Sequence, residues 1–279
     1  METREVFDQW NEGALYWERH RSAIERMFAP VAAALAEDAG IARGQTVLDV
    51  ATGPGEPALT LARLVGAEGS VVGVDLVPAM VEAARREAQR RDLANASFRA
   101  ASAQDLPFGN GAFDAVVSRF GVMLFPSPLA GLREMLRVLK PGGRLALAVW
   151  HYARNNPFHF LLNDLLERFL PSEPVPPDAP EPFRFAPPGK LLQVVREAGL
   201  AGASERLLRF DIEAELSLEE LWDIRTEMSD KLRHGLARLP RDAVGAIRRD
   251  FLAAASAYAS AGRVSFPAEA LVVSGHRAG

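Results

Sequence analysis

Residues 47–58 read Val47-Leu48-Asp49-Val50-Ala51-Thr52-Gly53-Pro54-Gly55-Glu56-Pro57-Ala58, a strand-like run that passes through a glycine turn into a helix. The first four residues are β-branched or apolar apart from Asp49, which suits a buried parallel strand. Gly53 and Gly55 permit positive φ and let a ligand approach bare backbone. Pro57 falls where the first turn of a helix needs no N–H donor. The stretch predicts a cradle for a nucleotide cofactor.

Strand-like and helix-like segments alternate between residues 44 and 150. Strand-like runs are found at 46–50, 70–76, 97–101, 113–118 and 144–150, and helical spacing at 57–65, 79–91 and 128–139. This alternation predicts an α/β fold with a doubly wound, mostly parallel sheet. In such sheets ligands bind outside the carboxyl ends of the strands. We expect Gly53, Asp75, Ser102 and Ser118 to share that rim.

The flanking segments have other patterns. Residues 3–39 show apolar residues at helical spacing, with Pro30 placed to bend or split the helix. After position 151 the alternation fails, and a run of prolines from Pro171 to Pro188 predicts an extended connection with little regular structure. Beyond it the pattern predicts helices at 189–198, 217–236 and 240–260, and strands at 203–210 and 268–274.

Composition narrows the classes of function. The chain of 279 residues is 48% hydrophobic and has a net charge of -4, without the basic excess typical of nucleic-acid binding. The absence of cysteine excludes disulfides, thiolate zinc sites and a cysteine nucleophile, and we expect no metal. No apolar run reaches the ~18 residues of a membrane-spanning helix. We expect a cytoplasmic protein without a membrane span, and its oligomeric state is not indicated. The arginines at 85–86 and 90–91 are expected on a solvated helix face.

The glycine turn by itself fits a dinucleotide. Gly53-Pro54-Gly55-Glu56-Pro57-Ala58 matches the G-x-G-x-x-A fingerprint, and Asp75 follows Gly55 by twenty residues. An NAD(P)-dependent Rossmann oxidoreductase therefore remains an alternative. Short-chain dehydrogenases, however, have a Tyr-x-x-x-Lys pair, and here the lysines are preceded at that spacing by Leu136, Ala186 and Glu227. A dinucleotide site also has no use for a carboxylate such as Asp49 inside the first strand, where burial is costly without a partner.

Two later segments extend the pattern. Asp105-Leu106-Pro107-Phe108 is followed by a strand that contains Phe113-Asp114, and residues 132–143 end in Lys140-Pro141-Gly142-Gly143. With these segments, residues 44–150 resemble a class I S-adenosylmethionine-dependent methyltransferase of the type-11 group, which includes the ubiquinone and menaquinone C-methyltransferases. The resemblance implies a seven-stranded sheet and S-adenosylmethionine as the cofactor.

The resemblance also implies residue roles. Asp49 would hold the loop or accept from the ammonium group of the cofactor, and Asp75 would bind its ribose hydroxyls. The remaining contacts would come from Ala51, Gly53 and Gly55 in the turn, Leu76 and Met80 beside the adenine, Ser102, Ala103 and Gln104 at its edge, and the carbonyl of Ser118 at the methionine amine. Ala51 replaces a glycine found in many members and adds only a methyl. Ser102 replaces their usual aspartate.

The implied activity is methyl transfer to a small-molecule acceptor at O, N or activated C, by in-line displacement in a closed pocket. Three parts are expected: an N-terminal helical lid at 1–43, the cofactor-binding half of the sheet at 44–150, and a C-terminal part at 151–279. The last belongs to the same domain and would build the acceptor pocket from insertions at 151–189 and 211–262.

Several residues are candidates for acceptor chemistry. His151 follows the fifth strand and is placed to act as a general base, although it could equally hydrogen-bond locally. The other histidines, His159 among them, rank lower. Tyr16, Trp17 and Arg119 are candidates for the lid or for substrate contact. A non-catalytic S-adenosylmethionine-binding protein is the other alternative.

Overall fold

A single mixed sheet crosses the molecule in the computed structural model, which describes residues 3–171 and 175–279. The parts of the expected segments 1–43 and 151–189 that fall at positions 1–2 and 172–174 lie outside the described residues. The strands are β1 (Thr46–Val50), β2 (Ser70–Asp75), β3 (Ala96–Ala100), β4 (Phe113–Arg119), β5 (Leu139–Trp150), β6 (Leu200–Ala214), β7 (Ala259–Ser260) and β8 (Arg263–Arg277).

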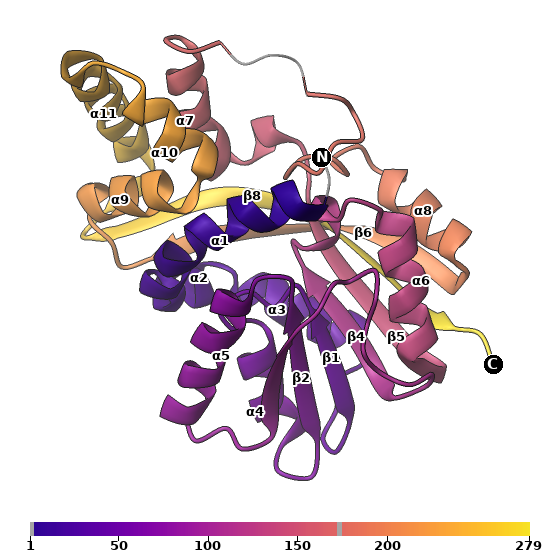
Figure 1. Ribbon diagram of the computed structural model, residues 1–279. Helices are drawn as coiled ribbons and strands as arrows, with labels where there is room; N and C mark the ends of the chain where they lie inside the picture. Colours follow the sequence, from indigo (N-terminus) through magenta and orange to yellow (C-terminus); the bar gives the residue numbers. More distant parts are fainter. Residues whose placement is uncertain (1–2, 172–174) are drawn as a thin grey trace.

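The strand order is β3-β2-β1-β4-β5-β8-β6, with the two-residue β7 paired to β8 (Figure 1). Strands β1 to β5 pair in parallel, whereas β8 runs antiparallel to both β5 and β6. The predicted doubly wound, mostly parallel sheet is therefore confirmed, with seven strands on its main path. The order reverses beside β1, so the crevice at a topological switch point lies at the glycine turn.

Helices cover both faces of the sheet. Their bounds are α1 (Thr3–Arg19), α2 (Arg21–Met27), α3 (Ala29–Asp38), α4 (Ala58–Val65), α5 (Pro78–Arg90), α6 (Pro128–Val138), α7 (Pro157–Glu167), α8 (Lys190–Ala198), α9 (Leu218–Met228), α10 (Asp230–Ala237) and α11 (Arg241–Ala255). Helices α3, α4 and α5 pack on one face, against Val47 and Val117, while α6 and α8 pack on the other, against Leu48 and Val116. Both faces of β1 are thus covered, which explains its apolar sequence.

Figure 1 shows α1 lying across the end of the parallel strands, with α7, α9, α10 and α11 gathered beside it over one end of β8. These helices come from the N-terminus and from the two expected insertions. Among the described residues, no helix combines the length and apolar character needed to cross a membrane.

The helical N-terminus is split, as the position of Pro30 predicted. Phe28 separates α2 from α3, and Pro30 lies in the first turn of α3, where its missing N–H leaves no hydrogen bond unmade. The predicted helix at 217–236 is also two helices, because the Ser229 side chain accepts from the Leu232 N–H and begins α10.

Helix α7 precedes the proline-rich connection and lies within the expected insertion at 151–189. The helix begins at Pro157, a favourable first position, and buries Phe158, Leu162, Leu165 and Leu166 on one face. The predicted strands at 203–210 and 268–274 are present but longer, since β6 and β8 pair along almost their whole length.

Candidate functional site

The glycine turn between β1 and α4 lies at the carboxyl edge of the sheet. Ala51, Gly53 and Gly55 have positive φ angles of 61°, 56° and 111°. A Cβ at Gly55 would lie 2.7 Å from Cδ1 of Leu59 and 3.2 Å from Cβ of Ala84, so this glycine allows the turn to pack closely on α4 and α5. A Cβ at Gly53 would meet nothing within 4 Å, which leaves its backbone open to a ligand.

Ala51 is held in the left-handed region, which costs a non-glycine residue about 1–2 kcal/mol. The next residue, Thr52, donates its N–H to the carbonyl of Val74 at 3.0 Å. Gly121 lies against the other side, since a Cβ there would be 2.6 Å from Cβ of Ala51. The alanine at this position was expected to add only a methyl group. It also strains the backbone, and close packing maintains that conformation.

Asp49 is completely buried in β1, beneath the turn. Its Oδ2 accepts from the N–H of Ala58 at 3.1 Å, at the start of α4. Its Oδ1 has no hydrogen-bond partner among the described residues, and neither does the buried hydroxyl of Thr52. Burial raises the pKa of Asp49 to about 7, against the lowering influence of the Thr52 hydroxyl and the Arg119 charge. The free carboxylate oxygen and the Thr52 hydroxyl are therefore close neighbours, and a ligand or a water molecule above the turn can bind both.

Asp75 joins the turn after β1 to the loop after β2. Its Oδ2 accepts from the N–H of Gly53 at 2.8 Å and its Oδ1 from the N–H of Val77 at 3.0 Å. Burial raises the pKa of Asp75, and the backbone N–H groups of Val77, Gly53 and Leu76 oppose that rise. Each carboxylate oxygen has a second lone pair, so Asp75 can hold the turn in place and still accept from a ligand hydroxyl.

The segment at 102–104 follows directly. Ala101 donates its N–H to the Asp75 carbonyl at 2.9 Å, which brings Ser102 and Ala103 to the same edge. Gln104 donates its N–H to the Ser102 hydroxyl at 3.2 Å, and its side-chain oxygen accepts from the Ser127 N–H at 2.8 Å. The Gln104 side chain therefore also anchors the start of α6.

The two later motifs, at 105–118 and 132–143, hold each other in place next to the segment at 102–104. Arg137 of α6 donates to the carbonyls of Leu106 and Phe108 at 2.8 and 2.7 Å, and Glu134 accepts from the Leu106 N–H at 2.9 Å. Lys140 pairs with Asp114 at 2.6 Å. The segments that carry the resemblance at 105–118 and 132–143 thus contact each other as a scaffold.

Helix α1 covers the cofactor-side edge. Met80 and Val77 are buried against Ala14 of α1, and the Trp10 and Trp17 rings pack beside them with centroids 5.6 Å apart. The indole Nε1 of Trp17 is buried and has no hydrogen-bond partner among the described residues. The Tyr16 ring, a lid candidate, lies 5.5 Å from the guanidinium of Arg19 and 5.1 Å from that of Arg233. Leu76, a cofactor candidate that follows β2, is partly exposed.

Ser118 and Arg119 end β4 beside the turn. The buried Ser118 hydroxyl donates to the Val50 carbonyl at 2.7 Å. Arg119 donates to the Glu56 carbonyl at 3.0 Å and lies over the Phe28 ring at 5.7 Å. Burial lowers the pKa of Arg119, while the charges of Glu56 and Asp49 oppose that effect. In this structure the Arg119 side chain supports the turn from below.

A buried ionic network also holds Glu56. Arg91 pairs with Glu25 of α2 at 2.5 Å, with Glu56 at 3.3 Å, and with Glu87 of α5. Only 8% of the Arg91 side chain is exposed, so the expectation of a solvated position is wrong for this arginine, whereas Arg90 is 64% exposed as expected. The reason is tertiary: α2 brings Glu25 over the end of α5.

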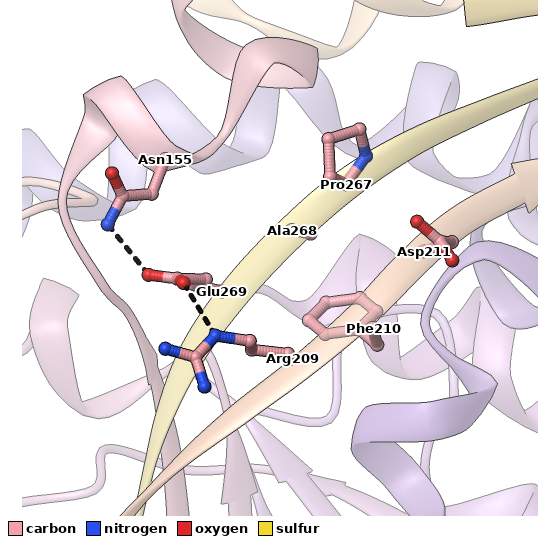
Figure 2. Close-up of a pocket in the computed structure, with 7 residues that line it drawn as sticks. All are labelled: Asn155, Arg209, Phe210, Asp211, Pro267, Ala268 and Glu269. Atoms are coloured by element: carbon pink, nitrogen blue, oxygen red, sulfur yellow. Dashed lines mark hydrogen bonds and ion pairs between the residues drawn. The ribbon is translucent and has the colours of Figure 1, made fainter.

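His151 lies beyond β5 in a different cluster. Its Nδ1 is 2.7 Å from Oε2 of Glu269. The same Oε2 accepts from Asn155 at 2.7 Å, while Oε1 accepts from Arg209 at 3.1 Å (Figure 2). Partial burial raises the pKa of Glu269, but the hydrogen bonds from these three side chains outweigh that effect, so the pKa lies below its usual value. Asn155, Glu269 and residues of β6 line a groove of about 410 Å³ that includes Phe210.

The structure thus brings the predicted cofactor residues to one edge, and His151 hydrogen-bonds in a cluster of its own with Glu269 and Asn155. The residues at that edge are Asp49, Ala51, Gly53, Gly55, Asp75, Leu76, Met80, Ser102, Ala103, Gln104 and Ser118. Sequence reasoning missed Arg225, which is 5% exposed. A signal was present, because Arg225 lies three and four residues after Trp222 and Leu221, on the apolar face of α9.

Known proteins share parts of this sequence and its fold. Residues 47–143 match a family described as a methyltransferase domain. The ubiquinone/menaquinone biosynthesis C-methyltransferase UbiE of Idiomarina loihiensis is 40% identical over 109 residues, which are 39% of this chain and 43% of that protein. The match therefore spans less than half the length of this curated relative.

Two solved structures share the architecture. The YcgJ protein from Bacillus subtilis aligns with a TM-score of 0.57 and 20% identity, over 89% of this chain and 98% of its own. Phosphoethanolamine N-methyltransferase 2 of Haemonchus contortus, solved with S-adenosyl-L-methionine, aligns with a TM-score of 0.57 and 15% identity, over 94% of this chain and 57% of its own. These likenesses confirm the fold, and the family match confirms the resemblance to methyltransferases.

Proposed function

We propose that this chain, whose residues 47–143 form a class I methyltransferase domain, binds S-adenosylmethionine at the turn after β1 and transfers its methyl group to a small molecule. The observation that carries the proposal is Asp49, a fully buried carboxylate with one unpaired oxygen beneath an open glycine backbone. A cation above the turn would compensate this charge, and the ammonium group of the cofactor is such a cation. A dinucleotide offers none at that place.

The residues at the edge fit the remaining parts of the cofactor. Asp75 keeps a free lone pair on each oxygen and is placed for ribose hydroxyls at the end of β2. Met80 supplies an apolar wall, and Ser102 to Gln104 supply polar groups at the next strand end. Helix α1, with Tyr16 and Trp17, would act as the lid that excludes water.

When bound, S-adenosylmethionine supplies an electrophilic methyl group on a sulfonium sulfur. The acceptor atom forms its bond to this carbon as the carbon–sulfur bond breaks, and the bonding pair leaves with sulfur as a neutral thioether. The protein then has to position the acceptor and exclude water, which can contribute ~7–11 kcal/mol to lowering the barrier. For a hydroxyl acceptor, His151 would remove the proton, with Glu269 holding its Nδ1.

Calorimetry with the full chain tests the proposal. We expect S-adenosylmethionine to bind and NAD or NADP not to bind, and methyl transfer to an acceptor from a panel of phenols, carboxylic acids, quinone precursors and amines to release S-adenosylhomocysteine. Binding of NAD(P) instead would support the oxidoreductase alternative. Cofactor binding without transfer to any acceptor would support a non-catalytic binding protein.

A further inference from the structure

Arg225, in the middle of α9, is a buried cation with no counter-ion among residues 3–171 and 175–279. It is 5% exposed, and its Nε has no hydrogen-bond partner in the same ranges. Burial lowers the pKa of Arg225 to about 10, and no carboxylate in the described part of the chain opposes that effect. Its guanidinium lies 4.6 Å from the centroid of the Phe158 ring. An arginine is seldom buried without an anionic partner, since the loss of hydration is then uncompensated.

Two further unpaired polar groups belong to α7, which packs near Arg225. The Nε2 of His159 and the Oδ1 of Asn163 are buried and have no hydrogen-bond partner in the described part of the chain. These residues are four positions apart and share one face of α7. Burial, and then the charge of Arg225, holds the pKa of His159 well below its usual value, so this imidazole is neutral. Unpaired buried polar groups are rare, and three of them together indicate a ligand or water.

An aromatic path leads from this cluster to the glycine turn. The His159 ring lies 4.5 Å from the Trp150 ring at the end of β5, and Trp150 stacks on Phe120 at 4.0 Å. Phe120 precedes Gly121, which abuts Ala51 of the turn. Phe183, from the proline-rich connection, closes the other side of His159 at 5.8 Å. A row of packed aromatic side chains therefore connects the polar cluster to the turn beside which the methyl group would be presented.

We propose that Arg225 and His159 bind the anionic group of the methyl acceptor, and that this acceptor is an organic monoanion with an apolar body. The inference rests on the proposed methyl transfer and specifies its substrate class. The planar guanidinium matches a carboxylate or an ionised enol or phenol. A dianionic phosphate is a poorer match, because the cluster contains a single positive charge. The groove beside Glu269 is less suitable, since the charge of its Arg209 is already compensated by that carboxylate.

The test compares two probes that differ only in charge, 2-naphthoate and its neutral amide 2-naphthamide. Their affinities for the full chain are measured by quenching of tryptophan fluorescence and by calorimetry, with and without S-adenosylmethionine. We expect the wild-type protein to prefer the naphthoate. Arg225→Met should weaken naphthoate binding about 10- to 100-fold and leave naphthamide binding within about twofold, since a bidentate contact to a charged group is lost.

Two further variants serve as controls. Arg209→Met, in the rival groove, should leave the preference for the anion unchanged. Arg225→Lys keeps the charge without the planar fork and should lose naphthoate affinity partially, which also serves if the methionine variant does not fold. A wild-type protein that binds naphthoate no more tightly than naphthamide, including no binding of either, overturns the inference, as does a loss caused by Arg209→Met instead of Arg225→Met. Cofactor binding by all variants is recorded separately, so a chain that binds the anion at Arg225 but not S-adenosylmethionine would refute only the proposed function.

Discussion

Replacing Asp49 by asparagine should stabilise the protein at alkaline pH and have little effect at acidic pH. The buried carboxyl has a pKa of about 7 in the folded chain, against a model value of 3.8. A carboxyl whose pKa is raised on folding destabilises the folded state when it is ionised. This destabilisation is absent below about pH 4, grows as the pH rises from about 4 to 7, and is constant above that.

The size of the effect follows from the pKa difference. A shift of about three pKa units corresponds to roughly 4 kcal/mol. Asparagine keeps an oxygen that can accept from the Ala58 N–H, so the existing bond of 3.1 Å is preserved while the charge is removed. We expect Asp49→Asn to raise the free energy of unfolding by about 4 kcal/mol at pH 8 and by less than about 1 kcal/mol at pH 4. At this chain length the gain at pH 8 corresponds to a rise in Tm of roughly 8 °C.

Urea unfolding of wild type and variant between pH 4 and pH 8, without cofactor, measures this difference. Asp114→Asn is the matched control, because Asp114 pairs with Lys140 at 2.6 Å and its pKa is lowered on folding in spite of partial burial. Its stabilising contribution is present above its unfolded pKa and is lost as the pH falls, so that variant should be destabilised at pH 8 and less so at pH 4. A gain for Asp49→Asn that does not increase with pH, or a loss at pH 8, would refute the reasoning.

Three further predictions concern the edge of the sheet. Asp75→Ala should weaken S-adenosylmethionine binding about 10- to 100-fold in calorimetry, because charged hydrogen bonds are lost, and an unchanged Kd would remove Asp75 from the site. Gly121→Ala should lower the free energy of unfolding by about 1–3 kcal/mol, since its Cβ would lie 2.6 Å from Cβ of Ala51; a variant as stable as wild type in urea would contradict this packing. His151→Ala should reduce kcat for a hydroxyl acceptor more than it weakens cofactor binding, and identical pH profiles of kcat in the two proteins would exclude a general base at this position.

The parts of the fold that the sequence predicted are those specified by local pattern. The run from Val47 to Ala58 contains a buried strand, a turn and a helix start in adjacent residues, and Asp75 follows at a fixed distance along the chain. The prediction failed where a distant contact decides the outcome. Arg91 has the sequence context of a solvated helix end, and only the position of Glu25 on α2 makes it a buried residue. The bounds of helix α7 were not predicted, although its apolar residues have helical spacing.

The candidate site also has one part that local sequence pattern predicted and one part that depends on distant contacts. Its cofactor edge could be listed residue by residue, because the carboxyl ends of parallel strands meet at one rim. The polar cluster in the helical layer could not, since His159 and Arg225 belong to helices 50 or more positions apart in the chain, and their meeting depends on how α7 and α9 pack over the sheet.

Asp49 and Arg225 are opposite charges on either side of a row of packed aromatic rings, and each is buried without a full set of partners. Both arrangements reduce the stability of the ligand-free chain, because burial removes hydration that the remaining contacts only partly replace. Each becomes favourable once a ligand of the opposite sign is bound, a cationic cofactor at Asp49 and an anionic acceptor at Arg225. The two charges do not compensate each other, because the rings of Phe120, Trp150 and His159 lie between them. On this reasoning Asp49→Asn should yield a more stable protein that binds its cofactor less tightly, as is common where active sites hold strained or unpaired groups.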